Sequence, residues 1–123
     1  MFNDWTEKYE YIIDLGKSLP VINDAFKTSD NTIKGCQSKV WLYAEYINNK
    51  LIFTADSDAI ITKGIIAILI RVFSNQSPKD IVDAKADFIE EIGLKQHLSQ
   101  TRANGLSSMI KQIKLYAVGY LNK

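Results

Sequence analysis

The sequence predicts an α+β fold in which a small antiparallel sheet of three strands packs against several helices. A β-hairpin pattern lies between residues 39 and 54, and apolar residues recur at helical spacing on both sides of it. No repeat, linker or low-complexity segment divides the chain, and its 123 residues are enough for one hydrophobic core. We therefore expect a single domain over residues 1–123.

The first predicted element is an amphipathic helix at about residues 4–17. Apolar residues recur there at spacings of three and four, so they share one helical face. These residues are Trp5, Tyr9, Ile12, Ile13 and Gly16. Pro20 stops the helix, and a short helical turn is expected at about residues 21–26.

Three short segments are predicted to form the sheet. A brief strand at residues 32–34 follows a turn-rich loop at 27–31. Residues 39–47 are rich in Val, Trp, Tyr and Ile, and residues 50–54 form the return strand. Asn48-Asn49 joins these two strands, because asparagine tolerates the positive φ angles of a two-residue hairpin turn.

A buried helix is expected directly after the hairpin, at about residues 59–73. It is apolar on nearly every side, which is typical of the central helix of a domain. Asp56, Ser57 and Asp58 precede it and supply the oxygens and negative charge that stabilise a helix N-terminus. We therefore expect these residues to cap the helix.

The last third of the chain is predicted to be helical. Ser77-Pro78 is typical of a helix start, so short helices are expected to about residue 83 and at residues 85–92. Ser99 is placed to cap the last helix. Gly105 lies in its second turn, where glycine costs about 1 kcal/mol relative to alanine. We expect a close approach of another backbone segment at that glycine.

The charge balance disfavours two classes of partner. Fifteen basic and fourteen acidic residues leave a formal charge of +1, too little to attract nucleic acid or an anionic membrane. The N-terminal residues lack the pattern of a targeting peptide, and the longest apolar run, residues 64–70, is far shorter than the roughly 20 residues that cross a bilayer. One cysteine cannot form an internal disulfide, so a cytoplasmic location is expected.

Metal and cofactor sites have little support. One Cys and one His do not make a common structural zinc site, and no loop of alternating oxygen ligands surrounds Asp56 and Asp58. There is also no glycine-rich phosphate loop. We therefore expect neither a metal nor a cofactor.

Cys36, the only cysteine, is the residue on which the function depends. Lys34 and Lys39 flank it and are expected to lower the pKa of its thiol modestly, while Gly35 can adopt a positive φ and expose it. Free cysteine is nevertheless among the most buried residue types, so an inert thiol in a structural interaction domain is the alternative. A Cys36-dependent hydrolase would need His97 as base, and no third group to orient that histidine is identifiable.

Several segments resemble one protein family. Gly35-Cys36-Gln37-Ser38 followed by Val40-Trp41 resembles the active-cysteine segment of SufE and its paralogue CsdE, the sulfur acceptors of cysteine desulfurases. Further segments are similar to family segments in the same order. They are residues 9–20, 56–59, 63–67, 77–82, 96–99, Arg102, residues 105–106 and 109–110. The resemblance covers nearly the whole chain, and Gln100, where family members often carry proline, is a small departure.

The resemblance implies a SufE-like fold and a function in sulfur transfer. Cys36 would accept persulfide sulfur from a pyridoxal-phosphate cysteine desulfurase of the SufS or CsdA kind and thereby stimulate that enzyme. The sulfur would then pass to an iron–sulfur cluster scaffold such as the SufBCD assembly. The protein would act as a transpersulfidation partner rather than as a stand-alone enzyme.

The same resemblance implies roles for five other residues. Gly35, Gln37 and Ser38 would form the loop that carries the active cysteine at one edge of the sheet. Asp58 and Arg102 match charged positions in shared motifs, where they would hold this loop or dock the partner. A helix cap and a surface cation are the equally open alternatives for these two residues.

Overall fold

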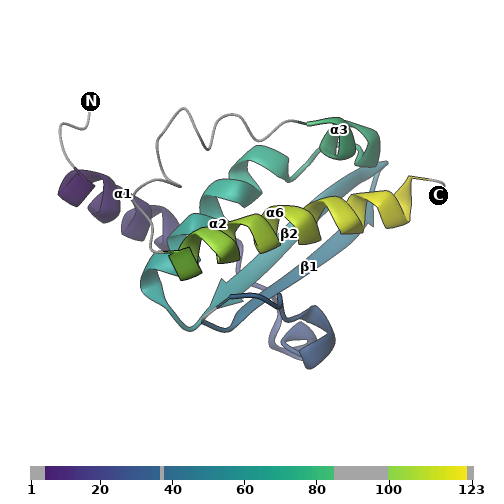
Figure 1. The fold of residues 1–123 in the computed structure, drawn as a ribbon. Helices are drawn as coiled ribbons and strands as arrows, with labels where there is room; N and C mark the ends of the chain where they lie inside the picture. The colour runs from purple at the N-terminus through teal and green to yellow at the C-terminus, as the bar shows by residue number, and fades with distance from the viewer. Residues whose placement is uncertain (1–4, 37, 85–99, 122–123) are drawn as a thin grey trace.

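The computed structural model of the protein describes residues 5–36, 38–84 and 100–121. Its elements follow one another as α1 (Trp5–Lys17), η1 (Asp24–Phe26), η2 (Ser29–Asn31), β1 (Val40–Ile47), β2 (Lys50–Ser57), α2 (Ile60–Phe73), α3 (Pro78–Asp83) and α6 (Gln100–Tyr120). Helices α2 and α6 cover one face of the β1–β2 sheet, and α1 packs against α2 (Figure 1). The predicted α+β fold class is confirmed.

The predicted hairpin is also confirmed. Strands β1 and β2 pair in antiparallel fashion from Val40 opposite Ser57 to the connecting turn, so β2 is longer than predicted. Asn48 and Asn49 adopt φ angles of 52° and 65°, as a type I′ hairpin turn requires. The local turn chemistry therefore specifies the register of the sheet.

The predicted third strand at residues 32–34 is wrong. Thr32 forms one isolated bridge with Trp41, and the N–H of Ile33 donates to the carbonyl oxygen of Val40 at 2.8 Å, but no ladder continues. The strand cannot extend in either direction, because η2 ends directly before Thr32 and a turn follows in which Gly35 has a φ of 89°. The sheet formed by the described residues has two strands, and the chain leaves it to form a loop that carries Cys36.

Helix α2 is the buried central helix, as predicted. Its buried residues face α1 on one side and β2 on the other. They are Thr62, Gly64, Ile65, Ile66, Ala67, Leu69, Ile70 and Phe73. A Cβ added to Gly64 would stand 2.1 Å from the carbonyl oxygen of Ile12, so α1 and α2 touch through their backbones. The inner face of the hairpin completes the core with Val40, Leu42 and Phe53, all without exposed surface.

The predicted cap of α2 is wrong. The residue at the N-cap position is Ala59, whose N–H donates to the hydroxyl of Ser57 at 3.2 Å. Asp56 belongs to β2, where its carboxylate forms ion pairs with Lys27 at 2.7 Å and with Lys63 at 3.4 Å. Because β2 extends through Ser57, the carboxylate of Asp56 reaches the side chain of Lys63 in the first turn of α2, but it does not cap the backbone N–H groups of that helix.

The later helices agree with expectation where they are described. The hydroxyl of Ser77 accepts from the N–H of Asp80 at 3.2 Å, and Pro78 opens α3. The last helix forms as expected, and its apolar residues at helical spacing are buried, including Leu106, Met109, Ile113 and Ala117. The helix predicted at residues 85–92 and the cap predicted at Ser99 lie outside the described residues. Among the described helices, none combines the length and hydropathy that a membrane span needs.

The helical turn expected at residues 21–26 is shorter than predicted. Only η1 is helical, and the side chain of Asn23 caps it by accepting from the N–H of Ala25 at 2.9 Å. Val21 instead lies beside β2 and forms an isolated parallel bridge with Ala55. The segment that follows α1 therefore protects the edge of β2 before it turns towards η1.

Candidate functional site

Cys36 lies on the loop between η2 and β1, outside the regular strands. Its side chain is half-buried against α6, where the thiol donates to the carbonyl oxygen of Gly105 with an Sγ–O distance of 3.7 Å. A Cβ added to Gly105 would stand 3.3 Å from this sulfur. The glycine expected to permit a close approach therefore does so, and the group that approaches it is the thiol.

The environment of Cys36 favours the protonated thiol. Burial raises the pKa of Cys36 above its ordinary value, because the thiolate loses hydration against α6. Its partner is a carbonyl oxygen, which accepts a proton donor but repels an anion. Lys34 and Lys39 are exposed and remain in solvent, so the expectation that they lower the pKa of Cys36 is wrong for this conformation.

Gly35 fixes the start of this loop on α6. Its φ of 89° lies in the left-handed region, which an L side chain rarely adopts. A Cβ on Gly35 would also stand 2.6 Å from the hydroxyl oxygen of Ser108. Since Gly105 and Ser108 are three residues apart on α6, the same helical face supports Gly35 and Cys36.

Asp58 holds the other end of the loop. Its Oδ1 accepts from the N–H of Lys39 at 3.1 Å, and its own N–H donates to the carbonyl oxygen of Lys39 at 3.3 Å. The hydroxyl of Ser57 donates to the same carbonyl oxygen at 2.8 Å. Asp58 therefore does not cap α2, and its carboxylate joins the end of β2 to the residue that precedes β1.

The remaining predicted site residues are only partly described. Ser38 is half-buried at a bend two residues before β1. Gln37 lies outside the described residues. Arg102 belongs to α6 near the start of that helix, but the description of side chains there begins at Ala103. Their roles stay predictions. Ser108 was not predicted, since a lone serine inside a helix gives no signal of a contact with a distant loop.

Among the described residues, Cys36 contacts a carbonyl oxygen and no side chain that could act as the base of a hydrolase. His97, the base that a hydrolase would need, lies outside the described residues. A Cys-dependent hydrolase works best with a thiol of lowered pKa, whereas the pKa of Cys36 is raised. Within the described ranges, no three His, Cys, Asp or Glu side chains gather as a metal site.

Comparison with known proteins agrees with the resemblance in the sequence. Residues 1–117 match the family described as SufE: Fe-S metabolism associated domain. An uncharacterized SufE-like protein from Rhizobium meliloti is 41% identical over 124 residues, which cover 97% of this chain and 89% of that protein.

One solved structure supports the fold. The solution structure of a hypothetical protein from Thermus thermophilus aligns with a TM-score of 0.77 over 96% of this chain and 87% of that chain. At 16% identity this likeness concerns the fold alone. The match of 117 residues and the relative at 41% identity establish the family: this chain belongs to the SufE family of proteins associated with iron–sulfur metabolism.

Proposed function

We propose that this protein accepts persulfide sulfur on Cys36 from a cysteine desulfurase and carries it to an iron–sulfur cluster scaffold. The observation that supports this best is the position of Cys36. Its thiol lies on a loop outside the sheet, half-buried, with one weak hydrogen bond to α6. Such a thiol is sheltered at rest, yet it can reach a partner without disturbing the core.

The proposed reaction is an exchange of sulfur between two thiols. The thiolate of Cys36 attacks the terminal sulfur of a persulfide on the desulfurase, and the bond between the two sulfurs of that persulfide breaks. The desulfurase thiolate leaves, and Cys36 becomes the persulfide. One sulfur–sulfur bond forms as another breaks, so the exchange needs no oxidant or reductant.

The burial of Cys36 gives this exchange an activation step. The raised pKa keeps the resting thiol protonated and slow to react. When the loop leaves α6, the sulfur regains hydration and its pKa falls towards the ordinary value. A partner that draws the loop outward when it docks therefore favours the thiolate of Cys36, and this nucleophile forms next to the donor persulfide.

A single cysteine suits a sulfur carrier. A second thiol in the same chain would attack the Cys36 persulfide, form an internal disulfide and release the sulfur as sulfide. The sequence has no other cysteine. The desulfurase partner would be of the SufS or CsdA kind and the acceptor a scaffold such as SufBCD. By removing the persulfide product, this protein would stimulate the desulfurase.

Intact mass spectrometry tests the proposal directly. The protein is mixed with a pyridoxal-phosphate cysteine desulfurase from the same genome and L-cysteine, and its mass is measured without reductant. We expect one added sulfur atom, lost on reduction and absent in Cys36→Ser. Desulfurase turnover should rise with the wild-type protein and not with Cys36→Ser. A chain that never gains sulfur, together with equal turnover for both proteins, would contradict the proposal.

A further inference from the structure

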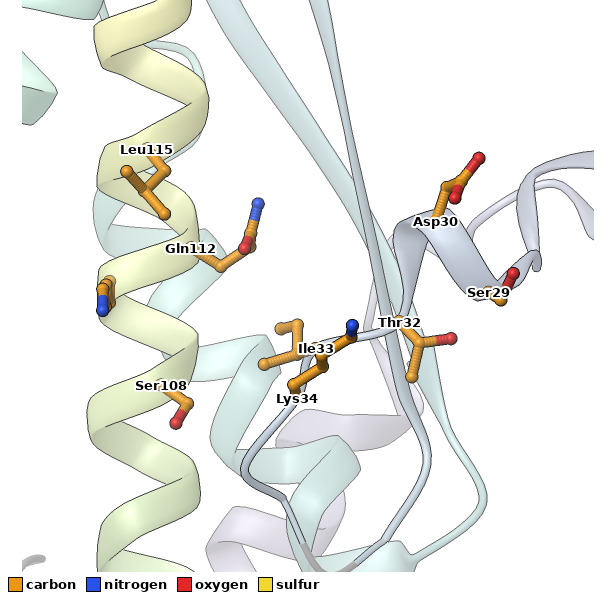
Figure 2. Close-up of a pocket in the computed structure, with 9 residues that line it drawn as sticks. Ser29, Asp30, Thr32, Ile33, Lys34, Ser108, Gln112 and Leu115 are labelled. Atoms are coloured by element: carbon orange, nitrogen blue, oxygen red, sulfur yellow. The ribbon is translucent and has the colours of Figure 1, made fainter.

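A groove runs along α6 beside the Cys36 loop. It has a volume of about 400 Å³ and lies between α6 and the chain from η2 to the start of the loop. Its lining residues are Ser29, Asp30, Thr32, Ile33, Lys34, Ser108, Lys111, Gln112 and Leu115. Figure 2 shows Ser108 and Gln112 projecting from α6 towards the facing segment. The sulfur exchange itself uses none of these side chains.

The groove and the thiol share the same two walls. Ser108 lines the groove and also contacts Gly35, the residue before Cys36. Gly105, which contacts Cys36, lies one helical turn before Ser108 on α6. Lys34 lies two residues before Cys36 on the opposite wall. Because the walls are continuous, the groove lies directly beside the loop to which a sulfur atom must be brought.

The groove carries an excess of positive charge. Its lining holds Lys34 and Lys111 against a single carboxylate, Asp30. Both lysines are exposed, and neither forms an ion pair with the described residues. Their ammonium groups are therefore available to an anionic group on a partner.

The other lining groups are those that an extended peptide would need. The side chains of Ser108 and Gln112 offer donors and acceptors for a peptide backbone, and the hydroxyl oxygen of Thr32, which donates to the carbonyl oxygen of Thr28, can still accept. Leu115, with 51% of its surface exposed, offers one apolar contact. A small apolar ligand would instead call for an enclosed apolar cavity.

We propose that this groove binds an acidic, extended segment of the desulfurase while that enzyme transfers sulfur to Cys36. The inference rests on the proposed function and adds a docking site to it. Lys34 and Lys111 pair with carboxylates of the segment, and an apolar residue of the segment packs on Leu115. Binding in the groove positions the partner over the loop before the thiol leaves α6.

Charge reversal at Lys111 tests this docking site, with Lys50→Glu as the matched control. The two variants make the same change of charge, and both lysines are exposed. Lys50 is a suitable control because it lies at the hairpin turn, outside the groove. Affinity for the desulfurase is measured by calorimetry at low and at moderate salt. We expect Lys111→Glu to weaken binding about fivefold to tenfold at low salt and Lys50→Glu to stay within about twofold. The difference should shrink as salt rises. Equal affinities of the two variants would overturn the proposal.

Two further measurements keep this test separate from that of the proposed function. At saturating protein, Lys111→Glu should still gain one sulfur on Cys36, because the lysine docks the partner and does not react. If the wild type binds with Lys111-dependent affinity but never gains sulfur, the proposed function fails while the docking site stands.

A short glutamate–leucine peptide should compete for the desulfurase-binding site on this protein. Competition by inorganic phosphate at equal ionic strength, without competition by the peptide, would overturn the docking site.

Discussion

Replacing Gly105 by alanine tests whether the contact with α6 holds the thiol in its buried position. The added Cβ would stand 3.3 Å from Sγ of Cys36, 3.7 Å from its Cα and 3.8 Å from its Cβ. Only the sulfur contact is tighter than an ordinary van der Waals contact, so the thiol must move away by a few tenths of an ångström. A loop held at both ends by hydrogen bonds and close packing can make so small a shift, whereas the helix backbone cannot.

Two opposing contributions decide the size of the effect. Alanine in a helix interior is favoured over glycine by about 1 kcal/mol, which stabilises α6. Crowding of the thiol costs a comparable amount, so the free energy of unfolding should change by less than about 1 kcal/mol. The displaced thiol is better hydrated, so burial raises its pKa less than in the wild type. The lower pKa leaves more thiolate at neutral pH, so alkylation of Cys36 should be about threefold to tenfold faster than in the wild type.

The assay is alkylation of Cys36 by iodoacetamide as a function of pH, together with urea unfolding. Gly119→Ala is the matched control, because a Cβ at Gly119 meets no atom within 4 Å on the same helix. We expect faster alkylation only in Gly105→Ala, with stability nearly unchanged in both variants. Unchanged alkylation in Gly105→Ala, combined with a loss of more than about 2 kcal/mol, would refute the reasoning, because the helix rather than the loop would then have given way.

Two further predictions concern carboxylates. Asp58→Ala removes an acceptor at the end of the loop, so alkylation of Cys36 should rise about twofold to fivefold, while Asp58→Asn should stay near the wild type. Equal rates in both variants would contradict this role. Burial raises the pKa of Asp56, but the contact with Lys27, the hydrogen bond from the N–H of Ser57 and the charge of Lys63 together outweigh burial and hold that pKa below its usual value. The ionised carboxylate therefore stabilises the fold above the pKa of the unfolded chain, about 4, and this contribution is lost as pH falls through the lower folded value. In urea unfolding, Asp56→Asn should cost about 1–2 kcal/mol at pH 7 and weaken the acid dependence below about pH 4, and an unaltered acid dependence would count against the ion pairs.

Features that depend on neighbours in the sequence were predictable. Asn48-Asn49 specifies the hairpin turn, and the apolar spacing in α1 predicts the face that buries Ile12. The apolar residues on nearly every side of α2 predict that it is the central helix. Ser77 and Pro78 likewise mark the start of α3. Each of these signals acts over a few residues, where backbone preference and side-chain spacing determine the conformation. The family resemblance rests on the same local segments read in order.

Contacts between distant segments were decided only by the tertiary structure. A motif of two aspartates beside a helix start predicts a cap, but Asp56 pairs with lysines of other elements and Asp58 binds the backbone of Lys39. The brief third strand was wrong because a turn at Gly35 takes the chain away from the sheet. Ion pairs and close contacts between distant segments therefore override the local preferences that predicted the helix cap and the third strand.

The sequence by itself determined that this chain has one cysteine in a polar, glycine-led segment and belongs with the SufE proteins. It also marked Gly105 as a position of close approach. Only the tertiary structure decided that the approaching group is Cys36, which lies 69 residues away along the chain. That contact reverses the expected direction of the thiol pKa, because desolvation depends on which surfaces meet in space and flanking lysines that stay in water cannot offset it.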